Sequence, residues 1–258
     1  MTKHHKQKKF NLDRKGKISL LPSILTTVSL FSGFYAIVSA INGQYLHAAV
    51  AIIVSGVFDG LDGRVARLTG TTSKFGMEYD SLCDLVAFGV APAILAYEWV
   101  LRPYGRYGWL AAFLYVATTA LRLARFNTQD TGSAKDEFTG LPCPAAAGMI
   151  ATSVMFCGFF DFTGPVKSVI MLATVYALSY LMVSSIKYLS FKHPQTDRAK
   201  KFQVLVGLVL LIMVLATEPR VTLFALGAVY VLSGPLAAVY RLLVREKKAV
   251  AEEQEDLA

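Results

Sequence analysis

Long apolar runs separated by short polar segments are the dominant pattern along the chain. A helix needs about 20 mostly apolar residues to cross the hydrocarbon core of a bilayer. Runs that approach or exceed this length, the seventh being the shortest, lie near residues 20–41, 46–68, 78–101, 109–126, 143–161, 166–190, 202–217 and 221–244. The pattern predicts an all-α fold, a polytopic membrane helical bundle of about eight transmembrane helices.

Composition agrees with this pattern, since 54% of the residues are hydrophobic and 17% are charged. Both values are far from those of an ordinary soluble domain. The first apolar run is long enough to span, and no small-residue cleavage site follows it directly, so we expect it to stay attached. The cysteines Cys83, Cys143 and Cys157 have no paired spacing, which argues against a disulfide framework and a structural zinc site.

The basic residues fall mainly on one side of the predicted spans. All but four of the 26 Lys and Arg residues lie on the side of the N-terminus, the exceptions being Arg102, Arg106, Lys167 and Arg220. The positive-inside rule then predicts an integral protein of the cytoplasmic membrane with both termini in the cytoplasm. Anionic lipid headgroups at that face explain the net charge of +8, and no motif for binding nucleic acid accompanies it.

Four aspartates lie close together inside sequence that otherwise reads as membrane. Asp59 and Asp62 are three residues apart and Asp80 and Asp84 are four apart, so each pair projects from one face of its helix. Carboxylates at membrane depth cost about 2.5 to 3.5 kcal/mol each, so a group of four needs a counter-charge. Oxygen ligands without His or Cys suit a hard cation, Mg²⁺, Mn²⁺ or Ca²⁺, rather than zinc. We therefore expect a metal-phosphate site.

These aspartates belong to a pattern of eight residue types at fixed spacing. The pattern is made of Asp59, Asp62, Gly63, Ala66, Arg67, Gly76, Asp80 and Asp84. It resembles the complete signature of the CDP-alcohol phosphotransferases. Two further stretches, RLARFN at 122–127 and GLPCPAAAG at 140–148, resemble the membrane-embedded phosphatidylserine synthases within that family.

The resemblance implies an enzyme that moves the phosphatidyl group of CDP-diacylglycerol to the hydroxyl of L-serine, giving phosphatidylserine and CMP. It implies a six-helix catalytic core within 19–190 and a pair of divalent cations, Mg²⁺ or Mn²⁺, held by Asp59, Asp62, Asp80 and Asp84. Asp84 would also take the proton of the acceptor hydroxyl. Metal ions held by carboxylates can neutralise a diphosphate and hold attacking and leaving oxygens in line. The site would face the cytoplasm.

The resemblance also implies residues that bind the CDP-lipid, each with a structural alternative. The implied contacts are Ser23, Thr26, Gly63, Arg67 and Ser73. Ser23 and Thr26 follow Pro22 where a helix start would also explain hydroxyls, and Ser73 would serve equally as a helix cap. Arg67 would otherwise anchor a helix end at the headgroups. Gly60 is assigned to close helix packing.

The acceptor is expected near the cytoplasmic end of the fourth run. Arg122, Arg125 and Asn127 carry groups that recognise the carboxylate of an amino acid. The alternative is that the two arginines are positive-inside anchors. Two other functions stay open. One is the same transfer to a different alcohol, such as glycerol phosphate or an inositol compound. The other is cation transport, because carboxylates inside a membrane also mark ion paths.

The segments outside the core carry weaker expectations. Residues 1–18 form a basic cytoplasmic segment, expected as an irregular tail, with a helix on the membrane surface as the alternative. Residues 191–245 add two transmembrane helices that lack polar chemistry and would supply packing or the surface of a homodimer. Residues 246–258 are expected to form a solvated cytoplasmic tail.

Overall fold

Helices make up nearly all of the protein in a computed structural model that describes residues 3–70, 73–128, 138–160, 164–188, 206–207, 209 and 213–255. In chain order the elements are α1 (Lys3–Ile41), α2 (Tyr45–Thr69), α3 (Lys74–Asp84), η1 (Leu85–Val90), α4 (Ala91–Ala96), η2 (Tyr97–Leu101), η3 (Arg102–Tyr104), α5 (Arg106–Thr128), β1 (Phe138–Thr139), α6 (Cys143–Phe159), α7 (Pro165–Val183), β2 (Lys187–Tyr188) and α9 (Pro219–Glu255). Within these residues the only sheet is the pair of two-residue strands β1 and β2, so the all-α prediction is confirmed.

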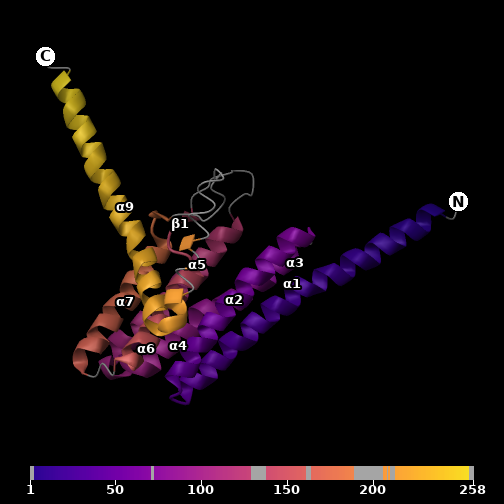
Figure 1. The fold of residues 1–258 in the computed structure, drawn as a ribbon, viewed down its shortest axis with the longest axis horizontal. Coiled ribbons are helices and arrows are strands. Elements are labelled where there is room, and N and C mark those ends of the chain that lie inside the picture. The colour runs from indigo at the N-terminus through magenta and orange to yellow at the C-terminus, as the bar shows by residue number, and fades with distance from the viewer. Residues whose placement is uncertain are drawn as a thin grey trace.

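The helices run up and down in one bundle, as Figure 1 shows. The turn from α1 to α2, the start of α5 and the facing ends of α6 and α7 lie at its lower end in this view. The facing ends of α2 and α3 and the end of α5 lie at the upper end, and the outer ends of α1 and α9 project from that end as well. This alternation places both ends of the chain on one side of the bundle, as the charge pattern predicts.

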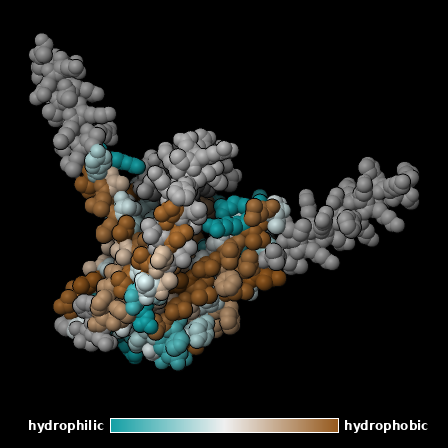
Figure 2. Space-filling model, in the orientation of Figure 1, coloured by the Kyte–Doolittle hydropathy of each residue, from teal (hydrophilic) through white to brown (hydrophobic). Residues whose placement is uncertain are grey.

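Among the described residues, five helical segments are long and apolar enough to cross a membrane, namely Pro22–Ile41, Tyr45–Thr69, Lys74–Tyr104, Val166–Val183 and Pro219–Arg241. Helix α6 is apolar but shorter, and α5 covers the predicted run 109–126. Part of the predicted run 202–217 lies outside the described residues. In the described part, residues 206–207, 209 and 213–217 are helical. On the face that Figure 2 shows, hydrophobic residues cover much of the middle of the bundle and hydrophilic ones gather toward its upper and lower ends, the surface expected of a membrane-spanning protein.

Helix α1 packs on α2 through hydroxyl groups spaced by three residues. The Oγ of Ser29 lies 2.8 Å from the Oγ of Ser55, and the Oγ of Ser32 donates to the carbonyl of Ala51 at 2.8 Å. Lower in the pair, the buried contacts are made by alanines such as Ala36. Small residues and hydrogen bonds between helices drive association where lipid supplies no hydrophobic force. These contacts hold α1 against α2 next to the part of α2 that carries Asp59 and Asp62.

The third predicted span is one helical stretch from Lys74 to Tyr104, but it is not α-helical throughout. The π-helical segment η1 begins at Leu85, directly after Asp84. A π turn adds a residue to the helical repeat, so side chains beyond Asp84 do not continue its face. A Cβ at Gly33 of α1 would lie 2.7 Å from the Cα of Ala87, so only glycine lets α1 approach this segment.

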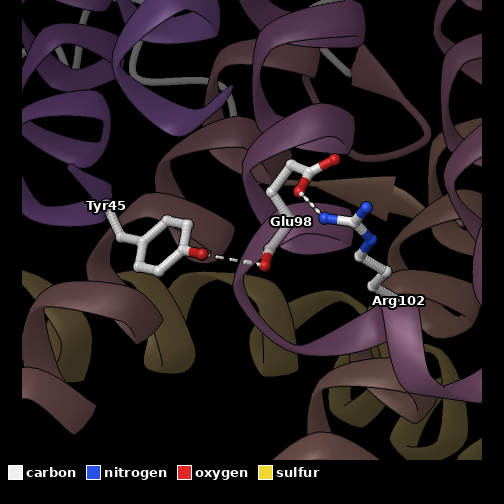
Figure 3. A network of polar contacts seen from close by, with 3 residues as sticks. All are labelled: Tyr45, Glu98 and Arg102. Carbon is white, nitrogen blue, oxygen red and sulfur yellow. Dashed lines mark hydrogen bonds and ion pairs between the residues drawn. The ribbon is translucent and has the colours of Figure 1, made fainter. Parts of the chain in front are cut away.

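At the lower end of the bundle a polar network ties α2 to the end of the same stretch (Figure 3). The Tyr45 hydroxyl donates to the backbone carbonyl of Glu98 at 3.0 Å. The carboxylate of Glu98 forms an ion pair with Arg102 at 3.3 Å. The start of α2 is therefore connected to η2 and η3 at the side away from the aspartates.

One expectation about the chain ends is wrong. Helix α1 continues outward to Lys3, so the basic N-terminal segment is helical rather than an irregular tail. Pro22 consequently lies inside this helix and not in its first turn, which removes helix-start chemistry as the explanation of Ser23 and Thr26. At the other end, α9 continues to Glu255, and its apolar segment Pro219–Arg241 agrees with the predicted run 221–244.

We predict that the two sides of the bundle can be distinguished by labelling cysteines in intact cells. The background would carry Cys157→Ser, and the probes would be Lys248→Cys at the end of α9 and Arg106→Cys at the opposite end of the bundle. A membrane-impermeant maleimide should label position 106 in intact cells and position 248 only after permeabilisation, because the side that carries most of the basic residues stays cytoplasmic. The reverse pattern would overturn the orientation, and labelling of both positions in intact cells would overturn the topology.

Candidate functional site

Three carboxylates from two helices meet near the upper end of the bundle. Asp59 and Asp62 come from α2 and Asp80 comes from α3, and one ligand oxygen of each lies within 4.8 Å of the others. Asp62 is only 4% exposed. The spacing of three residues on α2 and the return of the chain into α3 bring them together, as the sequence predicted.

The contacts where α2 ends and α3 begins explain Gly76, one of the two glycines of the signature. Gly70 ends α2 in the left-handed conformation, with φ of 62°. Ser73 then caps α3, because its Oγ accepts a hydrogen bond from the backbone N–H of Gly76 at 3.0 Å. A Cβ on Gly76 would lie 3.1 Å from that Oγ, which is tighter than most real contacts. The helix-cap interpretation of Ser73 is thus confirmed, and its contact with a CDP-lipid stays a prediction.

Thr26 holds one of the three carboxylates in place. Its Oγ1 donates to Oδ2 of Asp62 at 2.8 Å in a buried contact and also lies 3.0 Å from the carbonyl of Pro22. A bond of this kind fixes the rotamer of a carboxylate that would ligate a metal ion. The structure therefore places Thr26 behind Asp62 as a positioning residue. The family resemblance singled out Thr26, but the sequence carried no signal for this partner.

The donor set fits a divalent cation. Oδ1 of Asp80 is buried and has no hydrogen-bond partner among the described residues. The Asp84 side chain lies within hydrogen-bonding reach of Asp59 but is not part of the group of three. An unpartnered buried carboxylate oxygen among other carboxylates is costly in a protein interior unless a cation neutralises it. The residues present therefore match the hard-cation site that the sequence predicted, with Asp84 at its edge.

The face of α2 beside these aspartates is open. A Cβ on Gly60 would meet no atom of the described protein within 4 Å, so the prediction of close helix packing at this glycine is wrong. At Gly63 the only neighbour is the Arg67 guanidinium at 4.0 Å. The two glycines leave backbone accessible next to carboxylates, with an exposed cation one turn further along. This is the arrangement that a diphosphate needs for close approach.

Tyr79 is a site neighbour that the sequence did not single out. Its hydroxyl lies 3.0 Å from Oγ1 of Thr27, which in turn donates to the carbonyl of Ser23 at 2.7 Å. Tyr79 directly precedes Asp80, so this contact connects α1 to the helix that carries the third carboxylate. Ser23 lies on α1, one turn before Thr26 and Thr27. The alternation of apolar and polar residues gives no signal for such a contact.

The three expected acceptor residues do not form one cluster. Asn127 is tied to α3, because its Nδ2 donates to Oγ of Ser81 at 3.0 Å and to the carboxylate of Glu78 at 3.3 Å. Arg125 is exposed. Arg122 points into the bundle, where Nη1 donates to the carbonyl of Met182 at 3.1 Å. The spacing of three residues on α5 therefore leads to different environments rather than to a shared fork.

Arg122 lies beside the turn that enters α6. Gly140 has φ of 81°, and a Cβ there would lie 2.7 Å from Nη1 of Arg122. Cys143, the first residue of α6, has its thiol in hydrogen-bonding reach of Arg122 and within electrostatic range of Asp84. The stretch GLPC thus contacts the arginine of RLARFN through Gly140 and Cys143.

The family model of CDP-alcohol phosphatidyltransferase matches residues 19–179, and the chain belongs to this family of enzymes. Its relatives include the CDP-diacylglycerol–serine O-phosphatidyltransferase of Helicobacter pylori, 43% identical over 67% of this chain and 73% of the relative. The enzyme of the same name in Bacillus subtilis is 36% identical over 68% of this chain and 93% of its own. The archaetidylserine synthase of Methanothermobacter thermautotrophicus is 39% identical over 65% and 69%.

We predict that Thr26→Val weakens metal binding without removing it. Valine keeps the shape of the side chain but leaves Oδ2 of Asp62 without its donor. The metal concentration for half-maximal activity should rise about 10- to 100-fold, with recovery at high metal, because bonds behind a ligand typically carry that much affinity. The control is Thr152→Val, equally buried, whose hydroxyl bonds carbonyls of its own helix. An unchanged metal requirement in Thr26→Val would show that the contact does not position Asp62.

Proposed function

We propose that this protein transfers the phosphatidyl group of CDP-diacylglycerol to the hydroxyl of L-serine, releasing CMP. The names of its bacterial and archaeal relatives differ in the lipid, phosphatidyl against archaetidyl, but agree on serine. Because serine appears in the names of relatives that use different lipids, these names together support serine as the acceptor more strongly than one of them would alone. Membership of the family also favours group transfer over cation transport.

The observation that carries the proposal is the meeting of three carboxylates around an unpartnered oxygen of Asp80. Asp59, Asp62 and Asp80 would hold divalent cations, Mg²⁺ or Mn²⁺, and Asp84 would complete the set for a second ion. When bound, such ions neutralise a diphosphate and stabilise the charge of the leaving group. The protein contributes fixed ligand positions, with Thr26 holding Asp62.

The reaction forms one P–O bond and breaks another. The serine oxygen attacks the phosphorus that carries diacylglycerol, and the bond from that phosphorus to the bridging oxygen breaks, so CMP leaves with the electron pair. The hydroxyl proton goes to the carboxylate of Asp84, the general base. Asp84 suits this role because it lies beside Asp59 but outside the group of three carboxylates. Charge developing on the diphosphate is met by Arg67, whose guanidinium lies beside Gly63.

The donor would lie along the open face of α2. Gly63 and Arg67 would contact the diphosphate, and Ser23, Thr26 and Ser73 lie on the surrounding segments of α1 and the α2–α3 turn. The acyl chains would stay in the bilayer against the apolar sides of the bundle, while CMP leaves into the cytoplasm. This division agrees with the position of the aspartates in the second half of α2 and along α3, on either side of the connection between these helices.

The acceptor would enter on the side of α5. Arg125 is exposed there and is the most direct partner for the carboxylate of serine. Asn127, bonded to Ser81 on α3, would bring the acceptor toward the helix of Asp80 and Asp84. Arg122, bonded to Met182, would act from deeper in the bundle.

We expect purified protein in lipid to release CMP from CDP-diacylglycerol only with Mg²⁺ or Mn²⁺ and an acceptor. The assay would offer labelled serine, glycerol 3-phosphate and inositol side by side, and measure CMP and lipid product. Serine should be the acceptor used. Full activity in excess EDTA would rule out the metal-dependent mechanism, and preference for another alcohol would keep the reaction but change the acceptor.

We also predict that Asp84→Asn separates rate from donor binding. An amide cannot take the proton of the acceptor, so turnover should fall by about 100-fold or more, the lower range of general-base effects. Affinity for CDP-diacylglycerol should change little, because Asp59, Asp62 and Asp80 remain. The matched comparison is Asp62→Asn, which should lose both affinity and rate. If the two variants lose donor affinity equally, Asp84 acts only as a metal ligand, and its proposed role as the base is wrong.

A further inference from the structure

Helix α9 lies beyond the part of the chain that matches the family, yet it contacts the strand β2. Tyr188 of β2 is 2% exposed, and its hydroxyl donates to the backbone carbonyl of Val231 at 3.2 Å. Its ring packs on that of Tyr230 with centroids 5.7 Å apart. A Cβ on Gly234 would collide with the Tyr188 ring, so the ring lies directly on the backbone of α9.

The sequence of α9 prepares this contact in two ways. Gly234 removes the side chain that would block the ring. Pro235, inside the same helix, has no N–H, so the carbonyl four residues earlier loses its helical donor. That carbonyl belongs to Val231, the acceptor of the Tyr188 hydroxyl. Burial raises the pKa of Tyr188 to about 12, so the hydroxyl keeps its proton at neutral pH. Gly234 therefore makes room for the ring of Tyr188, and Pro235 leaves the Val231 carbonyl available for its hydroxyl.

The strand that carries Tyr188 holds the turn before α6. Phe138 pairs with Tyr188 and Thr139 with Lys187 in an antiparallel register. The backbone N–H of Gly140 then donates to the carbonyl of Ile186 at 2.7 Å. Any shift of β2 is therefore transmitted to Gly140 through backbone bonds.

Gly140 in turn lies against Arg122. A Cβ at Gly140 would lie 2.5 Å from the carbonyl of Met182 and 2.7 Å from Nη1 of Arg122, and these two atoms are bonded to each other at 3.1 Å. The same turn leads into Cys143, whose thiol lies in hydrogen-bonding reach of Arg122. A continuous series of contacts thus runs from Gly234 through Tyr188 and Gly140 to Arg122.

We propose that the packing of Tyr188 on Gly234 and Pro235 positions Arg122 and the turn at Gly140 for binding of the acceptor. This rests on the proposed function, in which Arg122 lies on the acceptor side of Asp84. Helix α9 is therefore part of the support of the site and not only a membrane anchor or a surface for another copy. The donor side, built from α1, α2 and α3, does not depend on it.

The test compares Gly234→Ala with Gly227→Ala on the same helix. A Cβ at position 227 would meet Met149 at 3.5 Å and Thr152 at 3.7 Å, which is ordinary contact. Gly234→Ala should raise the KM for serine about tenfold, the scale on which small misplacements of positioning groups act. Its KM for CDP-diacylglycerol should stay within about twofold of the original, and Gly227→Ala should leave both values unchanged.

A milder pair keeps the test decisive if Gly234→Ala does not fold. Tyr188→Phe removes only the hydroxyl bond to Val231, and Tyr45→Phe removes a bond of the same type at the lower end of the bundle (Figure 3). Tyr188→Phe should raise the KM for serine in the same direction by a smaller factor, and Tyr45→Phe should not. In the double variant Gly234→Ala with Tyr188→Leu, the smaller side chain should restore part of the loss, so the two effects should not add.

Two results would overturn the proposal. One is that Gly234→Ala and Tyr188→Phe match their controls in both KM values. The other is that both KM values and the thermal midpoint change together, which would mean general destabilisation. The wild-type protein in the same assay tests the proposed function separately. If it uses another alcohol, the KM shift is measured with that alcohol.

Discussion

The cost of placing carboxylates at membrane depth is the constraint on which this structure depends. Asp59, Asp62 and Asp80 meet within 4.8 Å, so each raises the cost of charging the others. The protein meets part of this cost with a hydroxyl from Thr26 and leaves an oxygen of Asp80 for a cation. A bundle of purely apolar helices would be more stable. The site therefore exists because neighbouring elements hold it together against electrostatic repulsion.

Those elements are arranged in two halves with different construction. The half that carries the three carboxylates uses hydroxyls between α1 and α2, a helix cap at Ser73 and a glycine where α1 approaches η1. The half around Arg122 uses contacts between segments far apart in the chain, in which β2 connects α9 to the turn before α6. The halves meet near Asp84, where the π-helical turn begins. Such turns are frequent at functional sites, because they re-aim a helix face without breaking the helix.

The sequence predicted the features that follow from periodicity and spacing. Apolar runs gave the helical bundle, and spacings of three and four placed the aspartates on shared faces. It did not predict the bond from Thr26 to Asp62, because partners 36 residues apart leave no local pattern. Helicity before residue 19 was missed for a different reason, since a basic segment has no apolar stripe to signal it. Arg122 and Arg125 show the limit of spacing arguments, because the first is half-buried and bonded to Met182 while the second is exposed.

The order of the contacts along the chain has a consequence for biogenesis. The described hydrogen bonds of Thr26 with Asp62 and of Ser73 with Gly76 join residues of α1, α2 and α3, and the later helix α5 adds the bonds of Asn127 with Glu78 and Ser81. The three carboxylates can therefore come together while the later helices are still being made. Tyr188 and Gly234, in contrast, meet only once α9 has been inserted. Assembly of the bundle would then proceed in two stages, with the carboxylates brought together first and the turn beside Arg122 completed later.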